Sequence, residues 1–220
     1  MNDLASRLRY RFPGSETMGR PYSQAGQDMF VLSMLNGLTQ GTYLEIGSCK
    51  AEEMSNTALL ERKFDWRGVG IEIVPEFVTE YNAQRTNKSF LGDATTADYV
   101  KLIADAGIEG NVLDYLSCDC EPPSVTLAAL QQVIGQGFQF AIITFEHDTY
   151  AQGDGIKQQS RSYLQQHGYV LVASNISESG VIHDFEDWWA HPDLVDPAFI
   201  ELFKANGDDI KFWANYIYPN

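Results

Sequence analysis

Basic side chains are scarce in this sequence. Its 220 residues include 15 Lys and Arg against 30 Asp and Glu, which gives a formal net charge of -15. A surface of this sign repels the phosphates of nucleic acids and of anionic lipids. The basic residues are scattered, with one small group at Arg7, Arg9 and Arg11. We therefore expect no nucleic-acid partner.

Long apolar runs and a disulfide framework are also lacking. No run approaches membrane-spanning length, and the N-terminal residues MNDLASRLRYRF contain no signal-peptide core. The three cysteines, Cys49, Cys118 and Cys120, form an odd set. Two of them, Cys118 and Cys120, alternate with Leu116 along an apparent strand, which favours core packing over metal binding. These features predict no membrane contact and a reducing, cytoplasmic setting.

Short apolar runs alternate with amphipathic segments along most of the chain. Such alternation predicts βαβ units and a parallel sheet with helices on both faces. Strands are expected at residues 42–47, 68–74, 89–93, 112–119, 138–147 and 169–176, and helices at 54–63, 75–85, 97–106, 125–134, 156–167 and 197–205.

The last part of the sheet departs from this rhythm. The turn signal SESG (177–180) separates the strand 169–176 from the alternating run VIHDFEDWW (181–189), and so short a link requires antiparallel strands. The predicted fold class is α/β: a doubly wound, mostly parallel seven-stranded sheet with an antiparallel C-terminal hairpin. Residues 41–220 are expected to form one Rossmann-like domain. Residues 1–40 are expected to form an N-terminal cap segment, whose helix, opened by Gln24, Gln27 and Asp28, either covers a cofactor or packs on the sheet.

Each of the first five predicted strands ends in a carboxylate. In open α/β sheets, ligands bind outside the carboxyl ends of the strands, so these acids are expected to share one edge of the sheet. The acids that close the strands are Glu45, Glu72, Asp93, Asp119 with Glu121, and Glu146 with Asp148. The sequence therefore predicts an acidic ligand site at this edge.

The turn after the first strand, in TYLEIGSCKAEEMSNT, lacks the run of glycines that a dinucleotide needs for its pyrophosphate. Its two glutamates would repel a phosphate, whereas S-adenosylmethionine carries a sulfonium and an ammonium and suits an acid-lined turn. By position, Glu72 is expected on the ribose hydroxyls, and Asp93 with Ala94 at the adenine. Gly47 either lets a ligand approach the backbone or simply ends the strand.

The chain resembles Class I S-adenosylmethionine-dependent methyltransferases and, within them, the FkbM-type family. The segments that carry the resemblance are YSQAGQD (22–28), YLEIG (43–47), SNTALLE (55–61), WRGVGIE (66–72), DCE (119–121) and FEDWW (185–189). It implies methyl transfer to a hydroxyl of a sugar, polyketide or related small molecule. It also implies contacts of Glu45, Gly47 and Ser48 with the methionine part of the cofactor, of Glu72 and Ile73 with the ribose, and of Asp93, Ala94 and Asp119 with the rest of the cofactor site. Relatives commonly carry a further glycine where this chain has Cys49-Lys50-Ala51.

Methyl transfer requires an acceptor positioned in line with the methyl group and a route for its proton. Asp119 and Glu146, completed by His147 or Asp148, offer a ligand set for Mg²⁺ or Mn²⁺, which would activate an acceptor hydroxyl. Alternatively, His147 acts as a metal-free general base. A third interpretation is that Asp119 only touches the cofactor while residues 146–148 cap a helix.

Three functions therefore remain open: an O-methyltransferase acting on a hydroxyl acceptor such as a saccharide, a nicotinamide-dependent oxidoreductase, and an inactive adenosyl-ligand-binding protein. A homo-oligomer is compatible with each of them. The aromatic residues Phe185, Trp188 and Trp189 are assigned to core and lid packing rather than to a substrate platform.

Overall fold

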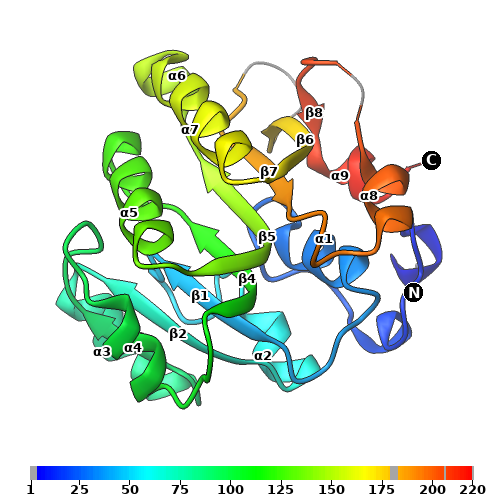
Figure 1. Cartoon of the computed structure of the whole chain (residues 1–220). Coiled ribbons are helices and arrows are strands. Elements are labelled where there is room, and N and C mark those ends of the chain that lie inside the picture. The colour runs from blue at the N-terminus through cyan, green and yellow to red at the C-terminus, as the bar shows by residue number, and fades with distance from the viewer. Residues whose placement is uncertain (1–3, 179–182, 206, 220) are drawn as a thin grey trace.

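The computed structural model describes residues 4–178, 183–205 and 207–219, and these form one α/β unit built on a single sheet (Figure 1). The strands follow the order β3-β2-β1-β4-β5-β7-β6-β8. Among the described strands, β7 alone runs antiparallel to its neighbours. The strands are β1 (Thr42–Ile46), β2 (Arg67–Glu72), β3 (Lys88–Leu91), β4 (Val112–Cys118), β5 (Gln139–Glu146), β6 (Val170–Ser177), β7 (Glu186–Ala190) and β8 (Lys211–Phe212).

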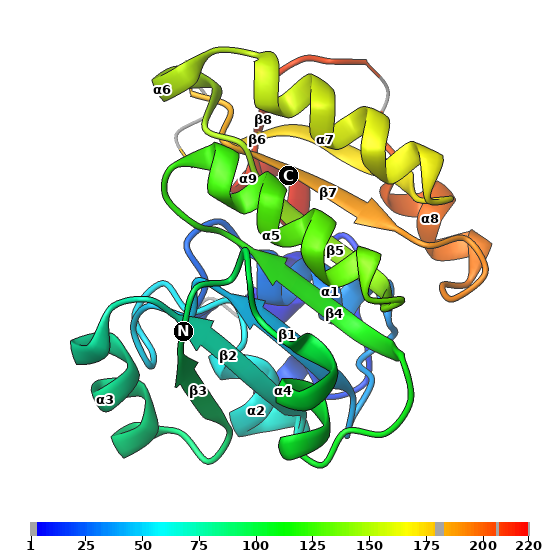
Figure 2. The same cartoon turned by 60° about the vertical axis from the view of Figure 1, so that its left-hand side comes forward.

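Helices cover both faces of the sheet, and each face has its own apolar core (Figure 2). One core receives side chains from α1 (Gln27–Met34), α2 (Ala58–Phe64), α8 (Pro197–Phe203) and α9 (Trp213–Ile217). The other receives side chains from α4 (Tyr99–Asp105), α5 (Pro123–Gly135) and α7 (Gly155–Gln166). The remaining helical segments are α3 (Pro75–Gln84), α6 (Thr149–Gln152) and the 3-10 turns η1 (Leu4–Arg7) and η2 (Ser15–Thr17).

Local sequence signals fix where several helices begin. Pro75 and Pro197 stand in the first turns of α3 and α8, where the missing N–H of proline costs no hydrogen bond. The side chains of Asp98 and Asp196 accept hydrogen bonds from Lys101 N and Ala198 N and cap α4 and α8. The predicted helices are therefore confirmed, with ends that shift by a few residues.

The sheet has eight strands rather than the expected seven. The two-residue strand β8 pairs with the end of β6, at Ile176 and Ser177, and carries no recognisable strand pattern in the sequence. The antiparallel strand begins at Glu186 rather than at residue 181, and residues 179–182 of the predicted turn and strand lie outside the described residues.

The segment before β1 contributes to the core. All eight residues of α1 are buried, and Asp28 holds the preceding turn by accepting hydrogen bonds from Tyr22 N, Ser23 N and Ser23 Oγ. The helix packs against the sheet, and the covering of a cofactor by this segment stays a prediction. No helix in the described part of the chain is both long and apolar enough to cross a bilayer.

Candidate active site

Strand register brings the predicted acids to one edge of the sheet. Ile46 at the end of β1 is level with Ile71 on β2 and with Cys118 on β4, and Cys118 is level with Phe145 on β5. The residues that follow these positions therefore emerge side by side, as expected for parallel strands.

A cavity of about 540 Å³ opens at this edge. Its wall is formed by the end of β2, by the turns after β1, β2, β3 and β4, and by the first turns of α3 and α5. The lining residues are Gly47, Cys49, Ile71, Glu72, Ile73, Val74, Phe77, Gly92, Asp93, Ala94, Thr95, Asp119, Cys120, Glu121 and Val125. Six residues predicted to contact the cofactor line this cavity: Gly47, Glu72, Ile73, Asp93, Ala94 and Asp119. We refer to it as the cofactor cavity.

Glu72 closes β2, and its carboxylate orders the floor of the cofactor cavity. Oε1 accepts hydrogen bonds from Ile73 N at 2.8 Å and Val74 N at 2.9 Å, and Oε2 accepts one from Cys49 N at 3.0 Å. Because a carboxylate offers about four acceptor sites, Glu72 retains capacity for a ligand hydroxyl. It also ties β2 to the first turn, where Cys49 has a φ of 40°.

Glu45 and Ser48 do not line the cofactor cavity, which corrects the expectation that both lie beside the cofactor. The Ser48 hydroxyl is buried against Ser89 Oγ at 2.6 Å. The Glu45 carboxyl accepts hydrogen bonds from Thr57 Oγ1 at 2.8 Å and Tyr81 OH at 3.2 Å, and it is 3% exposed. Burial raises the pKa of Glu45 to about 7 despite the nearby Arg85. Ser48 thus ties the first turn to β3, and Glu45 ties β1 to α3 and to the start of α2.

The backbone geometry at position 47 requires a glycine. Its φ is +81°, and a Cβ at this position would lie 1.7 Å from the carbonyl oxygen of Asp119. Gly47 therefore allows two strand ends to approach each other closely, and because it also lines the cofactor cavity, a ligand contact at its backbone stays a prediction.

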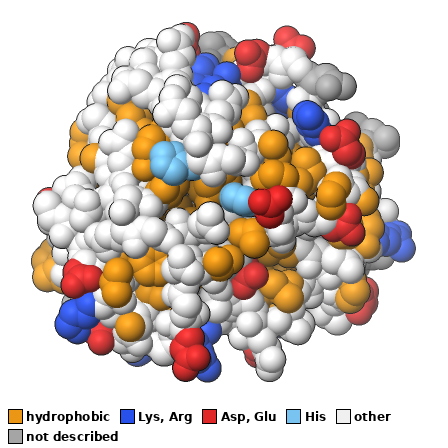
Figure 3. Space-filling model, viewed as in Figure 1, with side chains coloured by type: hydrophobic (Ala, Val, Ile, Leu, Met, Phe, Trp, Pro, Cys, Tyr) orange, Lys and Arg blue, Asp and Glu red, His pale blue; other side chains and the backbone are white. Residues whose placement is uncertain are grey.

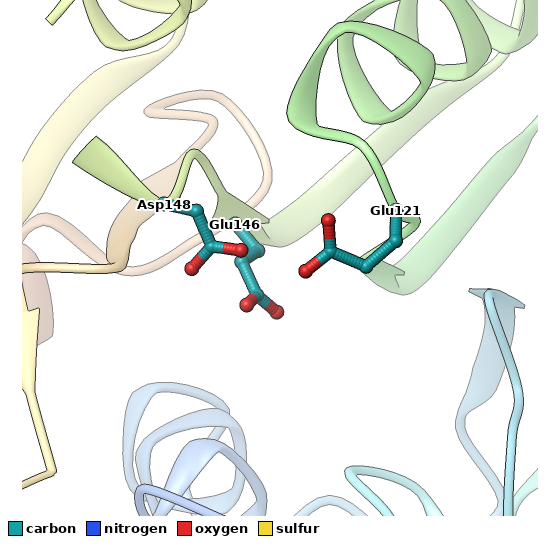
Figure 4. Close-up of side chains that lie close together, drawn as sticks. All are labelled: Glu121, Glu146 and Asp148. Carbon is teal, nitrogen blue, oxygen red and sulfur yellow. The ribbon is translucent and has the colours of Figure 1, made fainter. Parts of the chain in front are cut away.

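Three carboxyl groups meet beside the cofactor cavity: Glu121, Glu146 and Asp148. Each offers an oxygen within 4.8 Å of the others, and Figure 4 shows the three groups turned toward one another, Glu121 from the segment before α5 and the other two from the end of β5. Asp148 is 1% exposed, has a φ of 41°, and its Oδ1 lacks a hydrogen-bond partner among the described residues. We call these residues the carboxyl cluster.

Asp119 extends the carboxyl cluster toward the cofactor cavity. The Asp119 and Glu146 carboxyls are hydrogen-bonded; burial, foremost, raises the pKa of both groups, and for Glu146 the neighbouring negative charge of Asp119 adds to the rise. Burial and a hydrogen bond with Asp148 raise the pKa of Glu121 to about 7. Carboxyls packed this closely stay ionised together only beside a cation.

The predicted metal set of Asp119, Glu146 and His147 is not the group of residues that the structure assembles. His147 is fully buried, its Nε2 lies 3.5 Å from Asp187 Oδ1, and it lines neither the cofactor cavity nor the pocket described next. A β-strand sends successive side chains to opposite sides, so the residue after Glu146 faces away from it. Asp148, the alternative third ligand, and Glu121 take its place.

A second pocket of about 230 Å³ adjoins the carboxyl cluster through Glu146. Its other lining residues are Gln24, Tyr150, Ser177, Glu178, His183 and Phe185. Phe185 was assigned to packing, as were Trp188 and Trp189, which are fully buried. The sequence alone did not indicate that Gln24 and Glu178 line one pocket, because they come from segments far apart in the chain. We call this second pocket the acidic pocket.

No protein-family model and no curated protein sequence matches this chain. Solved structures do match. An O-methyltransferase from Bacillus cereus in complex with SAH is similar, with a TM-score of 0.51, 14% identity, and coverage of 78% of this chain and 83% of that one. Fibrillarin from Aeropyrum pernix with natively bound S-adenosyl-L-methionine is also similar, with a TM-score of 0.50, 12% identity, and coverage of 70% of this chain and 67% of that one. A putative rRNA-methylase from Clostridium thermocellum has a TM-score of 0.50 and 14% identity, and the match covers 78% of this chain and 97% of that one.

The chain thus has the Rossmann-like fold of Class I methyltransferases, as its strand order and antiparallel β7 also indicate. Because one similar structure is a putative rRNA-methylase, the fold does not support the expected exclusion of nucleic acid. That exclusion depends on charge alone. On the face drawn in Figure 3, Lys and Arg side chains lie apart from one another rather than forming a basic patch.

Proposed function

We propose that the protein is an S-adenosylmethionine-dependent methyltransferase that methylates a hydroxyl of a small molecule such as a sugar. One observation carries the proposal: a cavity of about 540 Å³ lies at the carboxyl ends of β1, β2 and β4, with Glu72 and Asp119 in its wall. Carboxylates favour the sulfonium and ammonium of this cofactor over a pyrophosphate. The FkbM-type motifs support the same proposal.

The first turn argues against a nicotinamide cofactor. In dinucleotide-binding folds, the helix begins directly after the glycine turn, so that its N-terminus meets the pyrophosphate. Here α2 begins only at Ala58, well beyond Gly47, and the intervening turn carries Glu52 and Glu53. The turn offers a phosphate no helix N-terminus.

In the proposed reaction, a lone pair of the acceptor oxygen attacks the methyl carbon, the bond from that carbon to sulfur breaks, and S-adenosylhomocysteine leaves. The acceptor proton passes to a carboxylate. Glu121 suits this role because it lines the cofactor cavity, belongs to the carboxyl cluster, and has a pKa of about 7. Asp119 and Glu146 are the neighbouring pair of carboxyl groups.

The carboxyl cluster also fits Mg²⁺ or Mn²⁺, because it offers three carboxylates, one with a buried oxygen that lacks a partner. A divalent cation bound there would lower the pKa of an acceptor hydroxyl. Glu121, Glu146 and Asp148 would then hold the cation, and the acceptor proton would pass to water.

Calorimetry with S-adenosylmethionine, S-adenosylhomocysteine and NAD tests the cofactor. We expect both adenosyl ligands to bind and NAD not to bind. Glu72→Ala should weaken binding by ~1–3 kcal/mol, the cost of removing a buried hydrogen-bonding group, whereas Glu76→Ala, on the exposed side of α3, should not. Heat with NAD alone would refute the proposal, and binding without turnover on any acceptor would favour an inactive binding protein.

A further inference from the structure

The acidic pocket adjoins the cofactor cavity at the carboxyl cluster, where it is placed to receive a second molecule beside the cofactor. Glu146 lines this pocket, whereas Asp119 and Glu121 line the cofactor cavity. The Asp119–Glu146 hydrogen bond and the short separation of Glu121 from Glu146 connect the two spaces. A hydroxyl in the acidic pocket can therefore reach the cluster that we propose takes its proton.

Aromatic rings and carboxyl groups form the wall of the acidic pocket. The Tyr150 ring, 56% exposed, meets the His183 ring edge to face at 5.3 Å, and Phe185 adds a third ring. Glu146 and Glu178 supply carboxyls, and no Lys or Arg is found among the described lining residues. Aromatic faces beside carboxylates bind the C–H face of a sugar ring or an ammonium group.

A basic side chain beside this wall is already paired. Lys157 on α7 lies 2.8 Å from Asp184 Oδ2 and 2.9 Å from Asp154 Oδ1. An anion entering the acidic pocket would therefore meet the exposed carboxylate of Glu178 with no compensating cation among the described lining residues, whereas a cation would pair with it.

We infer that the acidic pocket holds the methyl acceptor, and that it admits a small hydroxyl compound that is uncharged or carries an amine while excluding one that carries a phosphate or a carboxylate. The inference rests on the proposed function and names its substrate class. At about 230 Å³, the pocket lies below the roughly 300–1,000 Å³ typical of sites for drug-sized ligands. It suits a single sugar ring or the end of a larger acceptor.

Saturation-transfer NMR with the protein held in excess S-adenosylhomocysteine tests this inference, because the method detects millimolar binding. The probes are glucosamine, methyl glucoside and glucose 6-phosphate, which share one ring and differ in charge. We expect signals from the first two, strongest for glucosamine, and none from the phosphate. Binding of glucose 6-phosphate as strong as that of glucosamine would overturn the inference.

Two variants of the acidic pocket then test whether the probes bind there. Tyr150→Ala should abolish it for both binding probes, and Glu178→Gln should lower the signal of glucosamine several-fold relative to methyl glucoside. Glu109→Gln is the matched control, because this exposed glutamate lines a separate pocket with Gln40 and Arg67.

Failure of the pocket assignment and failure of the proposed function give different results. Signals that survive both pocket variants, or no signal from any probe, would overturn the assignment of the acidic pocket. Calorimetry of S-adenosylhomocysteine on the same sample reports separately on the proposed function, which stands if that ligand binds and falls if it does not.

Discussion

The Arg85 guanidinium donates a hydrogen bond from Nε to Glu61 Oε2 at 2.6 Å, with side chains that are 0% and 10% exposed. Its other nitrogens donate to Tyr43 OH at 3.1 Å, Thr57 Oγ1 at 3.0 Å and Ser55 Oγ at 3.2 Å. One buried cation thus connects β1, the first turn and α2.

Removing this cation should be costly. Arg85→Met leaves the carboxylate of Glu61 buried without its partner, so we expect the free energy of unfolding to fall by ~3–5 kcal/mol. The matched control is Arg62→Met, because Arg62 pairs with Glu52 at the surface and such pairs contribute about 0–1 kcal/mol. Urea denaturation measures both, and equal losses would show that the buried network is not stabilising.

Gly47→Ala should prevent the first turn from closing. The new methyl group would overlap the carbonyl oxygen of Asp119, in addition to the strain of a φ of +81°. Gly110→Ala isolates the second effect, because Gly110 has a φ of +83° and a Cβ there meets no described atom within 4 Å. We expect the control to lose ~1–2 kcal/mol and Gly47→Ala to lose more and to bind S-adenosylhomocysteine poorly. Similar losses in denaturation would contradict this account.

Stability should fall as the pH rises toward 8. Burial, foremost, raises the pKa of Glu186 from 4.5 to about 8, so the folded protein holds a proton that the unfolded chain releases. This contribution is complete below pH 4.5 and is lost as the pH passes 8. Glu186→Gln remains neutral and can still accept from Gln27 Nε2 and Trp188 Nε1.

The free energy of unfolding of Glu186→Gln, measured in urea from pH 5 to 9, should therefore decline less steeply than that of the unmodified protein. Glu16→Gln, at an exposed site, is the control and should leave the slope unchanged. Parallel pH profiles for the unmodified protein and Glu186→Gln would show that Glu186 is not held protonated.

Terbium luminescence tests the carboxyl cluster without an activity assay. Tb³⁺ prefers the same oxygen ligands as Mg²⁺, and Tyr150, two residues after Asp148, can transfer excitation to it. Glu121→Gln and Asp148→Asn should each weaken binding by at least about tenfold, since each removes a charged ligand. His147→Asn should not, because His147 faces Asp187 instead. Loss of binding only in His147→Asn would restore the ligand set expected from sequence.

Local sequence patterns determine most of the secondary structure of this protein. Alternating apolar runs and helix signals such as Pro75 were enough to predict the parallel strands, the helices between them and the antiparallel strand near the C-terminus. The acids that close β1, β2, β4 and β5 were visible because parallel strands must end at one edge, which is a consequence of topology rather than of packing.

The tertiary structure decided what each acid does. Glu45 and Glu72 both close strands, yet Glu45 turns into the Tyr81 and Thr57 network while Glu72 faces the cofactor cavity. His147 and Asp148 are neighbours in sequence, but a positive φ at Asp148 sends its carboxyl into the cluster while His147 is buried. The sequence determined which residues reach the edge of the sheet. Which of them face a ligand depended on side-chain direction and on partners such as Arg85, which are distant in the chain and have no local signature.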